Sequence, residues 1–397
     1  MSEIKNFEYC VPTNVIFGRD THKDTGKIIK NYGFKKIMLH YGMGSVKKSG
    51  LYDEIVKSLN ENGIDFTELG GAEPNPKIGL VREGVSVCKR ENVEMILAVG
   101  GGSVIDSAKV MAIAALSDYD AWDFSCQRQK AERSLPVGCV LTIAASGSET
   151  STSAVITNNV DGNLRRGFNS EQNRPLFAIL NPCLTFSVSK YQTACGIVDI
   201  MMHTLERYFT TSKPFKITDS ISEGLLRTVI DAGKRAIDNP CDYDARANLM
   251  WAGSLSHNGI TGLGTAHFME CHQIEHELSG MFDSVAHGAG LAVIFPAWAK
   301  YILKYNVDRF FEFAVNIWGI NPYGKEKYDV AMLGIEKCEE FFKSIGMPVK
   351  LNELNIDVSD GQIEEMAEKC TFFGKRTLPD YIELGKKEII DIYNLAK

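Results

Sequence analysis

The sequence predicts an α/β N-terminal domain over residues 1–184, with a parallel sheet, and an all-α C-terminal domain over residues 185–397. The first half alternates short apolar runs with glycine turns and helical periodicity, which is typical of a parallel sheet covered by helices. From about Ser187 onward, helical periodicity continues with almost no strand signal. A chain of 397 residues also exceeds what one hydrophobic core usually serves, so two domains are expected.

The predicted strands of the first half share an apolar core that ends in a glycine or polar turn. They are residues 35–41, 93–99, 136–142 and 176–180, with a further strand-like segment at 9–17. Helices are expected at 51–59 and 104–116, each after a glycine turn. The run at 93–99 is nearly all apolar, as expected of a parallel strand covered on both faces.

Helical spacing of apolar residues dominates the second half. The predicted helices are 196–209, 218–237, 246–258, 330–345 and 363–372. No Gly/Ser linker separates the two halves, so the sequence predicts that the domains pack closely and leave a ligand cleft between them.

Composition excludes several classes of function. The net charge of −7 and the pI near 5.7 argue against nucleic acid as a partner. The first residues lack the pattern of a signal peptide, and no run of about 18 apolar residues predicts a membrane span. The ten cysteines form no CxxC pair, so they are expected to be reduced, and the cytoplasm is the expected location.

Three polar turns follow predicted strands and favour a nucleotide. Gly100–Ser103 ends an apolar strand and opens a helix, where backbone N–H groups and the helix dipole suit a phosphate. Gly42, Gly44 and Ser45 offer the same chemistry on a smaller scale, and Thr142–Glu149 adds hydroxyl groups. Neither glycine turn matches GxGxxG or a P-loop, and purely structural turns remain the alternative. Three such turns together favour a dinucleotide.

Histidines concentrate in one part of the chain and predict a metal site. Five of the eight histidines lie between His257 and His287. Asp199 and His203 are four residues apart in a helical segment, as are His272 and His276, so each pair shares a helix face. His287 would lie about 22 Å from His272 along one straight helix, so a turn or second helix must return it to a common site.

Imidazole and carboxylate groups together suit Fe(II), Zn(II) or a similar divalent ion. Such an ion acts as a Lewis acid on an alkoxide or a carbonyl oxygen during hydride transfer. The alternative for either pair alone is a solvated helix face or a hydrogen bond within the core.

Taken in order, these motifs resemble the iron-containing (group III) alcohol dehydrogenase family, in particular its butanol dehydrogenase and aldehyde reductase branch. The resemblance runs through nearly the whole chain. It is carried by residues 71–76 (GAEPNP), 100–106 (GGGSVID), 142–149, 196–199 with His203, and 272–279 with His287 and Gly288.

The resemblance implies a Rossmann-like dinucleotide-binding domain followed by a helical metal-binding and catalytic domain, the fold that dehydroquinate synthase shares. The implied metal ligands are Asp199, His203, His272 and His287, and a proton-relay or positioning role falls on His276. The implied cofactor contacts are Gly42, Gly44, Ser45, Gly101, Gly102, Ser103, Asp106, Thr142 and Ser148. Arg165 is a further candidate, either for a phosphate or ribose contact or as an ordinary exposed arginine.

Cofactor choice is expected to favour NADP(H) over NAD(H). Family members specific for NAD tend to carry a carboxylate just after the first nucleotide-binding strand. Residues 41–45 contain none, while Ser45, Lys47 and Lys48 follow and suit a 2′-phosphate.

The function expected first is interconversion of small primary alcohols and aldehydes, with one divalent metal that polarises the substrate oxygen. A glycerol-dehydrogenase-like polyol oxidoreductase is the alternative within this architecture. A dehydroquinate-synthase-like lyase is disfavoured, because residues 251–281 hold no Lys or Arg to bind phosphate and carboxylate. A non-enzymatic metal-binding protein is the last alternative. The resemblance also suggests a homodimer, with the 9–17 segment as a possible pairing edge.

Overall fold

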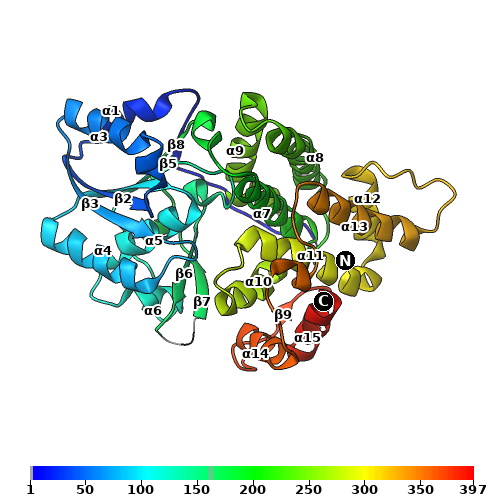
Figure 1. The fold of residues 1–397 in the computed structure, drawn as a ribbon. Coiled ribbons are helices and arrows are strands. Elements are labelled where there is room, and N and C mark those ends of the chain that lie inside the picture. Colours follow the sequence, from blue (N-terminus) through cyan, green and yellow to red (C-terminus); the bar gives the residue numbers. More distant parts are fainter. Residues whose placement is uncertain (1–2, 161, 163) are drawn as a thin grey trace. The chain divides into compact units, whose positions relative to one another are not determined.

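The computed structural model describes residues 3–160, 162 and 164–397 (Figure 1). The described chain forms two compact units, Cys10–Val188 and Ser189–Lys397, and residues 3–9 belong to the second. The sequence-based boundary lay after residue 184 and assigned the whole N-terminus to the first domain. The N-terminal segment joins the helical unit because Lys5 N–H donates to Gly264 O at 3.0 Å and Phe7 packs near Phe215.

The first unit is built on a six-stranded sheet, and every paired strand in it is parallel. The spatial order is β1, β8, β5, β4, β2, β3. The strands are β1 (Asn14–Phe17), β2 (Lys36–Gly42), β3 (Asp65–Ala72), β4 (Met95–Gly100), β5 (Val137–Leu141) and β8 (Phe177–Leu180). This confirms the predicted parallel sheet.

Helices cover both faces of this sheet. They are α1 (Thr25–Asn31), α2 (Ser45–Lys48), α3 (Leu51–Glu61), α4 (Ile78–Glu91), α5 (Gly102–Ala115) and α6 (Ala121–Ser125). In Figure 1, α1 and α3 lie on one face, and α4 and α5 lie on the other. Alternation along β2 explains this: Leu39 joins the core under α3, while His40 on the opposite face contacts Ser107 of α5.

Two features of this unit lie outside the sequence prediction. The edge strand β3 carries polar residues such as Glu68 on its half-exposed face, so it has no apolar run. An antiparallel hairpin of β6 (Ser153–Asn158) and β7 (Leu164–Asn169) follows the Thr142–Glu149 turn.

The strand expected at 9–17 is limited to Asn14–Phe17, since Pro12 has no N–H to donate.

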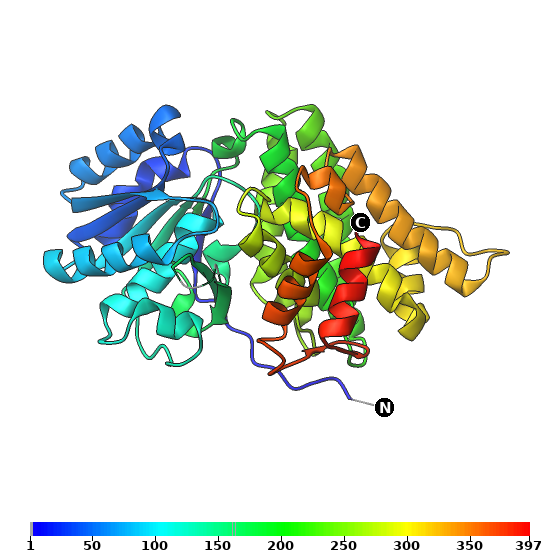
Figure 2. The ribbon, with the colours of Figure 1, turned by 60° about the horizontal axis from the view of Figure 1, so that its bottom comes forward.

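The second unit is helical, as predicted. Its helices are α7 (Lys190–Tyr208), α8 (Lys216–Asp238), α9 (Tyr243–His257), α10 (Glu270–Met281), α11 (His287–Ile302), α12 (Val307–Asn316), α13 (Lys327–Ser344), α14 (Asp360–Cys370) and α15 (Lys386–Leu395). Figure 2 shows these helices from a second side. The short strands β9 (Leu378–Pro379) and β10 (Glu383–Leu384) form one small antiparallel pair. Among the described helices, none combines the length and hydrophobicity that a membrane span needs.

The strand order of the parallel sheet fixes where a ligand can bind. The chain passes from β2 outward to β3 and then returns to the other side of β2 to form β4. Strand order therefore reverses between β2 and β4, and in open α/β sheets the carboxyl ends at such a reversal form the ligand crevice. The turns at Gly42–Ser45 and Gly100–Ser103 lie at these two ends.

Candidate metal centre and nucleotide-binding turns

Helix α7 brings three polar side chains to one buried face. Ser189 caps the helix, its side chain accepting from Gln192 N–H at 3.2 Å. Asp199, His203 and Glu206 follow at i, i+4 and i+7, which places them along one stripe. All three are at most 5% exposed, although α7 is otherwise packed with apolar residues. Buried polar groups in such a setting require specific partners.

Two further helices bring the remaining histidines to α7. His272 and His276 lie one turn apart on α10, and His287 is the first residue of α11. A Cβ at Gly288 would lie 2.1 Å from the backbone oxygen of Cys195, and one at Gly290 would lie 2.7 Å from Glu275. Only glycine at these positions lets α11 approach α7 and α10 so closely. The predicted return of His287 through a second helix is therefore what the structure has.

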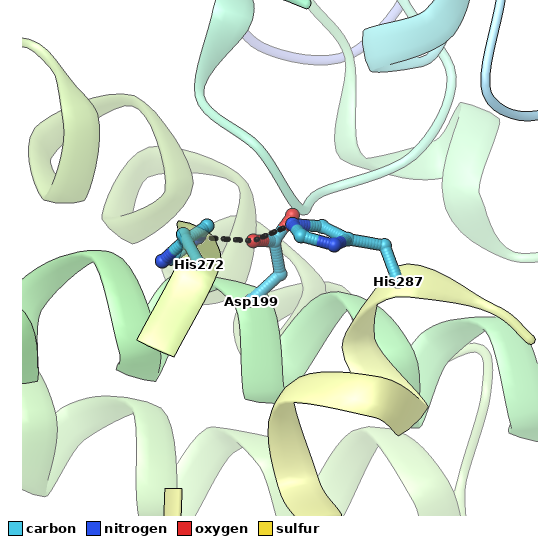
Figure 3. A group of neighbouring side chains, drawn as sticks. All are labelled: Asp199, His272 and His287. Carbon is cyan, nitrogen blue, oxygen red and sulfur yellow. Dashed lines mark ion pairs between the residues drawn. The ribbon is translucent and has the colours of Figure 1, made fainter. Parts of the chain in front are cut away.

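Asp199 lies at the centre of the histidine cluster. Its Oδ1 atom is 3.6 Å from His272 Nε2 and 3.8 Å from His287 Nε2, and Figure 3 shows the carboxylate between the two rings. His203 Nδ1 is 3.3 Å from the same oxygen. Asp199, His272 and His287 can place one ligand atom each within 4.8 Å of one another. His203 is beside this group but not part of it in the conformation described.

Two buried glutamates bind the histidine rings on the side that faces away from Asp199. The Nδ1 atoms of His272 and His287 form hydrogen bonds to Glu206 Oε2 and Glu275 Oε2, respectively. Glu206 also accepts from the backbone N–H of His272 at 3.2 Å. Both glutamate side chains are fully buried. Each of these histidines is therefore held between a carboxylate at Nδ1 and Asp199 on the Nε2 side.

Burial and charge act differently on two of the rings. Burial acts to lower the pKa of His272, but the carboxylates of Glu206 and Asp199 outweigh it and raise that pKa to about 9. For His203, burial lowers the pKa well below its ordinary value, and the neighbouring His257 and His272 add to the decrease. A neutral His203 keeps a lone pair that can bind a cation.

His276 borders the cluster on its more accessible side. Its ring centroid is 5.5 Å from that of His287 and 6.4 Å from that of His272. His276 is partly exposed, whereas His272 is buried. The side chain is therefore next to the metal-facing rings and can also be reached from outside.

The glycine turn after β4 is close-packed where a phosphate would need backbone contact. Helix α5 begins at Gly102, and no side chain caps its N-terminus. A Cβ at Gly102 would lie 2.4 Å from Ser146 Oγ, so the turn after β4 lies directly against the turn after β5. Gly44 has φ near +115°, a conformation that favours glycine.

Asp106 and Ser148 meet in a buried network with a residue that the sequence analysis missed. Ser148 Oγ donates to Asp106 Oδ1 at 2.6 Å, and Lys109 Nζ donates to Ser148 Oγ at 2.8 Å. Lys109 is fully buried, and burial lowers its pKa to about 8. Burial also raises the pKa of Asp106, although Lys109 opposes that shift. The network ties α5 to the turn after β5.

A carboxylate of β3 lies beside the residues that follow β2, and the sequence analysis did not consider it. Glu68 of β3 accepts from Tyr41 Oη at 2.7 Å and from Tyr52 Oη, and Lys47 Nζ is 3.4 Å from its Oε2 atom. Lys47 also lies over the rings of Tyr41 and Tyr52. The ammonium group proposed for a 2′-phosphate therefore already faces an acid.

Two other nucleotide candidates occupy different settings. Thr142 directly follows β5, and its N–H donates to Gly100 O at 3.1 Å, so it lies beside the glycine turn. Arg165 pairs opposite Thr157 in the hairpin and is 7% exposed. The alternative of an ordinary exposed arginine is therefore wrong for Arg165.

Comparison with known proteins places the chain in a family. A sequence model of iron-containing alcohol dehydrogenases matches residues 12–182, and the model of the C-terminal part of Fe-containing alcohol dehydrogenases matches residues 193–396. The chain belongs to the iron-containing alcohol dehydrogenase family. As a member, it is a metal-dependent, NAD(P)-linked oxidoreductase of alcohols and aldehydes.

Individual relatives of this alcohol dehydrogenase cover almost its full length. It is 40% identical over 389 residues to the NADH-dependent butanol dehydrogenase A of Clostridium acetobutylicum, with 98% of each chain covered. It is 34% identical over 360 residues to the NADPH-dependent aldehyde reductase YqhD of Escherichia coli, covering 90% of this chain and 91% of that one. The crystal structure of NADH-dependent butanol dehydrogenase A from Thermotoga maritima superposes over the whole of both chains with a TM-score of 0.94 and 38% identity.

The residues of this alcohol dehydrogenase fit the metal that the family implies. Asp199 Oδ1, His203 Nδ1 and His272 Nε2 are buried and have no hydrogen-bond partner among the described residues. Because His272 bonds to Glu206 through Nδ1, Nε2 is the ring nitrogen that faces Asp199 Oδ1 and that a metal could take. Two ligand atoms on one tetrahedral metal ion are about 3.4 Å apart, and the separations from Asp199 Oδ1 are 3.3 to 3.8 Å.

Glu206 and Glu275 are the site residues that sequence reasoning missed. One signal for Glu206 was available: it lies seven residues after Asp199, on the same face of a helix made largely of apolar residues. Glu275 lies three residues after His272, which places both side chains near the same face of α10. Acidic residues at such spacings are also common on solvated helices. The pattern alone therefore does not distinguish a buried site residue from an exposed surface acid.

Proposed function

We propose that this enzyme interconverts small primary alcohols and aldehydes, with the helical unit holding the metal and the α/β unit binding the nucleotide. The observation that carries this proposal is the set of buried, unpaired nitrogen and oxygen atoms around Asp199. The named activities of the butanol dehydrogenase and aldehyde reductase relatives support the substrate class.

Asp199, His203, His272 and His287 would hold one Fe(II) or Zn(II) ion. When bound, the ion supplies Lewis acidity to the substrate oxygen while hydride moves between the substrate carbon and nicotinamide. Asp199 presents its oxygen to three imidazoles, and the buried surroundings limit competition from water. His203 would be the fourth ligand, since its Nδ1 atom lies 3.3 Å from Asp199 Oδ1.

His276 would move the proton of the substrate hydroxyl. Its imidazole lies beside the rings of His272 and His287 and is partly exposed, so it can exchange a proton with solvent. An imidazole has an ordinary pKa near the middle of the physiological range, which suits general acid–base catalysis.

Nucleotide binding is proposed at the carboxyl ends of β2, β4 and β5. Gly101, Gly102 and Ser103 would receive the pyrophosphate at the N-terminus of α5. Gly42, Gly44 and Ser45 would lie along the adenosine ribose, and Thr142 and Arg165 would contact the cofactor from neighbouring segments. Asp106 and Ser148 would act indirectly: their buried hydrogen-bond network would hold the turn after β5 in place beside the cofactor.

NADP(H) is proposed as the preferred cofactor because Lys47 and Ser45 follow β2 and residues 41–45 contain no acid. Two observations favour NAD(H) instead. Glu68 lies 3.4 Å from Lys47 Nζ, and the butanol dehydrogenase relatives are named as NADH-dependent. Comparing kcat/KM for NADPH and NADH with butanal separates the two possibilities.

A homodimer in the cytoplasm is the proposed form of the enzyme. Strand β1 is an edge of the parallel sheet and pairs only with β8 among the described strands, which leaves one side for a second copy. The ten cysteines form no disulfide in the part of the chain that the structure describes, which suits a reducing compartment. Sedimentation velocity tests the dimer.

The decisive test of the proposed reaction is turnover with short aldehydes and polyols. Oxidation of NADPH with butanal, faster than reduction of NADP⁺ with glycerol, would support the proposal. Preferential turnover of glycerol would favour the polyol alternative.

A further inference from the structure

The two histidines that face Asp199 through Nε2 are each backed by a buried carboxylate. Glu206 accepts from Nδ1 of His272, and Glu275 accepts from Nδ1 of His287. The glutamates come from different helices, α7 and α10, and the histidines from α10 and α11. One arrangement therefore occurs twice in the same site, each time across a helix–helix contact.

Burying these carboxylates needs a compensating interaction. An ionised carboxylate taken from water into a protein interior is costly unless it is paired and hydrogen-bonded. Glu206 and Glu275 add two acids to Asp199 within one buried cluster, and both glutamate side chains are fully buried. A divalent cation between the Nε2 atoms and Asp199 would offset this accumulation of negative charge.

Hydrogen bonding at Nδ1 of a histidine also decides whether its Nε2 atom carries a lone pair that can bind a metal. A proton fixed on Nδ1 by a carboxylate leaves a lone pair on Nε2, and the bond holds the ring at a fixed angle. The Nε2 atoms of His272 and His287 point to the same oxygen of Asp199, at 3.6 and 3.8 Å. Both rings are thus oriented as ligands.

We propose that Glu206 and Glu275 are positioning residues that fix the tautomer and orientation of His272 and His287 and so set the affinity for the metal. This inference rests on the proposed metal site. His203 provides a contrast, because its Nδ1 atom faces Asp199 and forms no hydrogen bond in the described structure. The two glutamates therefore organise two of the three histidines before the metal arrives.

The test is the dissociation constant for Zn²⁺, measured by competition with a chromophoric chelator, in the full-length chain and its variants. Glu206→Gln and Glu275→Gln keep the side-chain size but remove the charge, and each should weaken Zn²⁺ binding by about 10- to 100-fold. Glu206→Asp and Glu275→Asp keep the charge and should recover part of the affinity. The visible spectrum of the Co²⁺-loaded Gln variants should differ from that of the unmodified chain, because the ring orientation changes.

A matched control separates positioning from general stability. Asp219 is a buried acid in the same unit, and it pairs with Arg309 instead of a histidine. Asp219→Asn should lower the melting temperature of the metal-free protein and leave the Zn²⁺ dissociation constant unchanged. Melting of each metal-free Gln variant shows whether it is folded, and the two glutamates give independent tests.

The outcomes are distinguishable. If the unmodified chain binds no stoichiometric Zn²⁺, or if His272→Ala binds it unchanged, the proposed metal site fails. If His272→Ala loses Zn²⁺ but both Gln variants fold and bind it with unchanged affinity and Co²⁺ spectrum, the metal site stands and the positioning role of the glutamates is overturned.

Discussion

His287 Nε2 lies 3.8 Å from Asp199 Oδ1, so the first residue of α11 faces the middle of α7. Two glycines make this approach possible: Gly288 lies against the backbone of Cys195, and Gly290 lies against Glu275. A buried carboxylate and a partly exposed imidazole in this position are the core of the proposed metal site.

Replacing Asp199 with asparagine should remove the charged ligand at the centre of the site. We expect less than stoichiometric metal after purification and a fall in kcat/KM of about 10³-fold, since metal polarisation of a substrate oxygen is worth several kcal/mol. Metal analysis by mass spectrometry and steady-state kinetics check this. Retention of one metal ion per chain with normal turnover would contradict the ligand assignment.

Replacing Gly102 with alanine should impair the nucleotide site without unfolding the protein. The new Cβ would lie 2.4 Å from Ser146 Oγ, so the turn after β5 must shift. We expect the dissociation constant for the nucleotide to rise by about tenfold, or about 1.4 kcal/mol, measured by fluorescence titration. Adding Ser146→Gly should restore part of the affinity, whereas an unchanged constant in Gly102→Ala would place the pyrophosphate elsewhere.

Lys47 and Glu68 should act in opposite directions on cofactor preference. Lys47→Ala should raise KM for NADPH more than for NADH, because it removes the proposed partner of the 2′-phosphate. Glu68→Gln should lower KM for NADPH, since the acid 3.4 Å from Lys47 Nζ would no longer compete. Equal effects on both nucleotides in both variants would contradict a 2′-phosphate site at Lys47.

His40 should make stability sensitive to acid. Its Nδ1 atom is 2.7 Å from Leu69 O, and burial lowers the pKa of this ring to about 4, below its ordinary value near 6.5. Between these pH values the unfolded chain binds a proton that the folded chain does not. The stabilisation is therefore complete above pH 6.5 and is lost as the pH falls toward 4, by about 1.4 kcal/mol per pH unit.

The corresponding variant is His40→Gln, which keeps a polar side chain capable of hydrogen bonding and does not titrate. Its melting temperature should fall less steeply than that of the unmodified chain between pH 6.5 and 4.5 in calorimetry. Parallel curves for the two proteins would show that His40 is not the titrating group.

Much of the fold could be predicted because its strands are buried on both faces. β4 is almost entirely apolar and ends at Gly100, a pattern typical of a central parallel strand that leads into a helix. β3 was missed because it lies at the sheet edge, where a half-exposed residue such as Glu68 interrupts the apolar pattern. In this sheet, the apolar pattern predicts a strand well where both faces of the strand are covered.

The histidine site could be predicted in part. The four-residue spacing of Asp199 and His203 fixes a shared helix face, and so does that of His272 and His276. The packing of α7, α10 and α11 against one another belongs to the tertiary structure, and residue spacing along the chain does not predict it. For the same reason Glu206 and Glu275 could not be recognised, because an acid on a helix becomes a hydrogen-bond partner only when another helix packs against it.

Metal-dependent hydride transfer is tested by the oxidation of NADPH and NADH with butanal before and after chelation. We expect turnover that is faster with NADPH, is abolished by the chelator and returns on addition of Fe(II) or Zn(II). Turnover that survives complete removal of the metal, or no turnover with either nucleotide after reloading with both ions, would contradict this expectation.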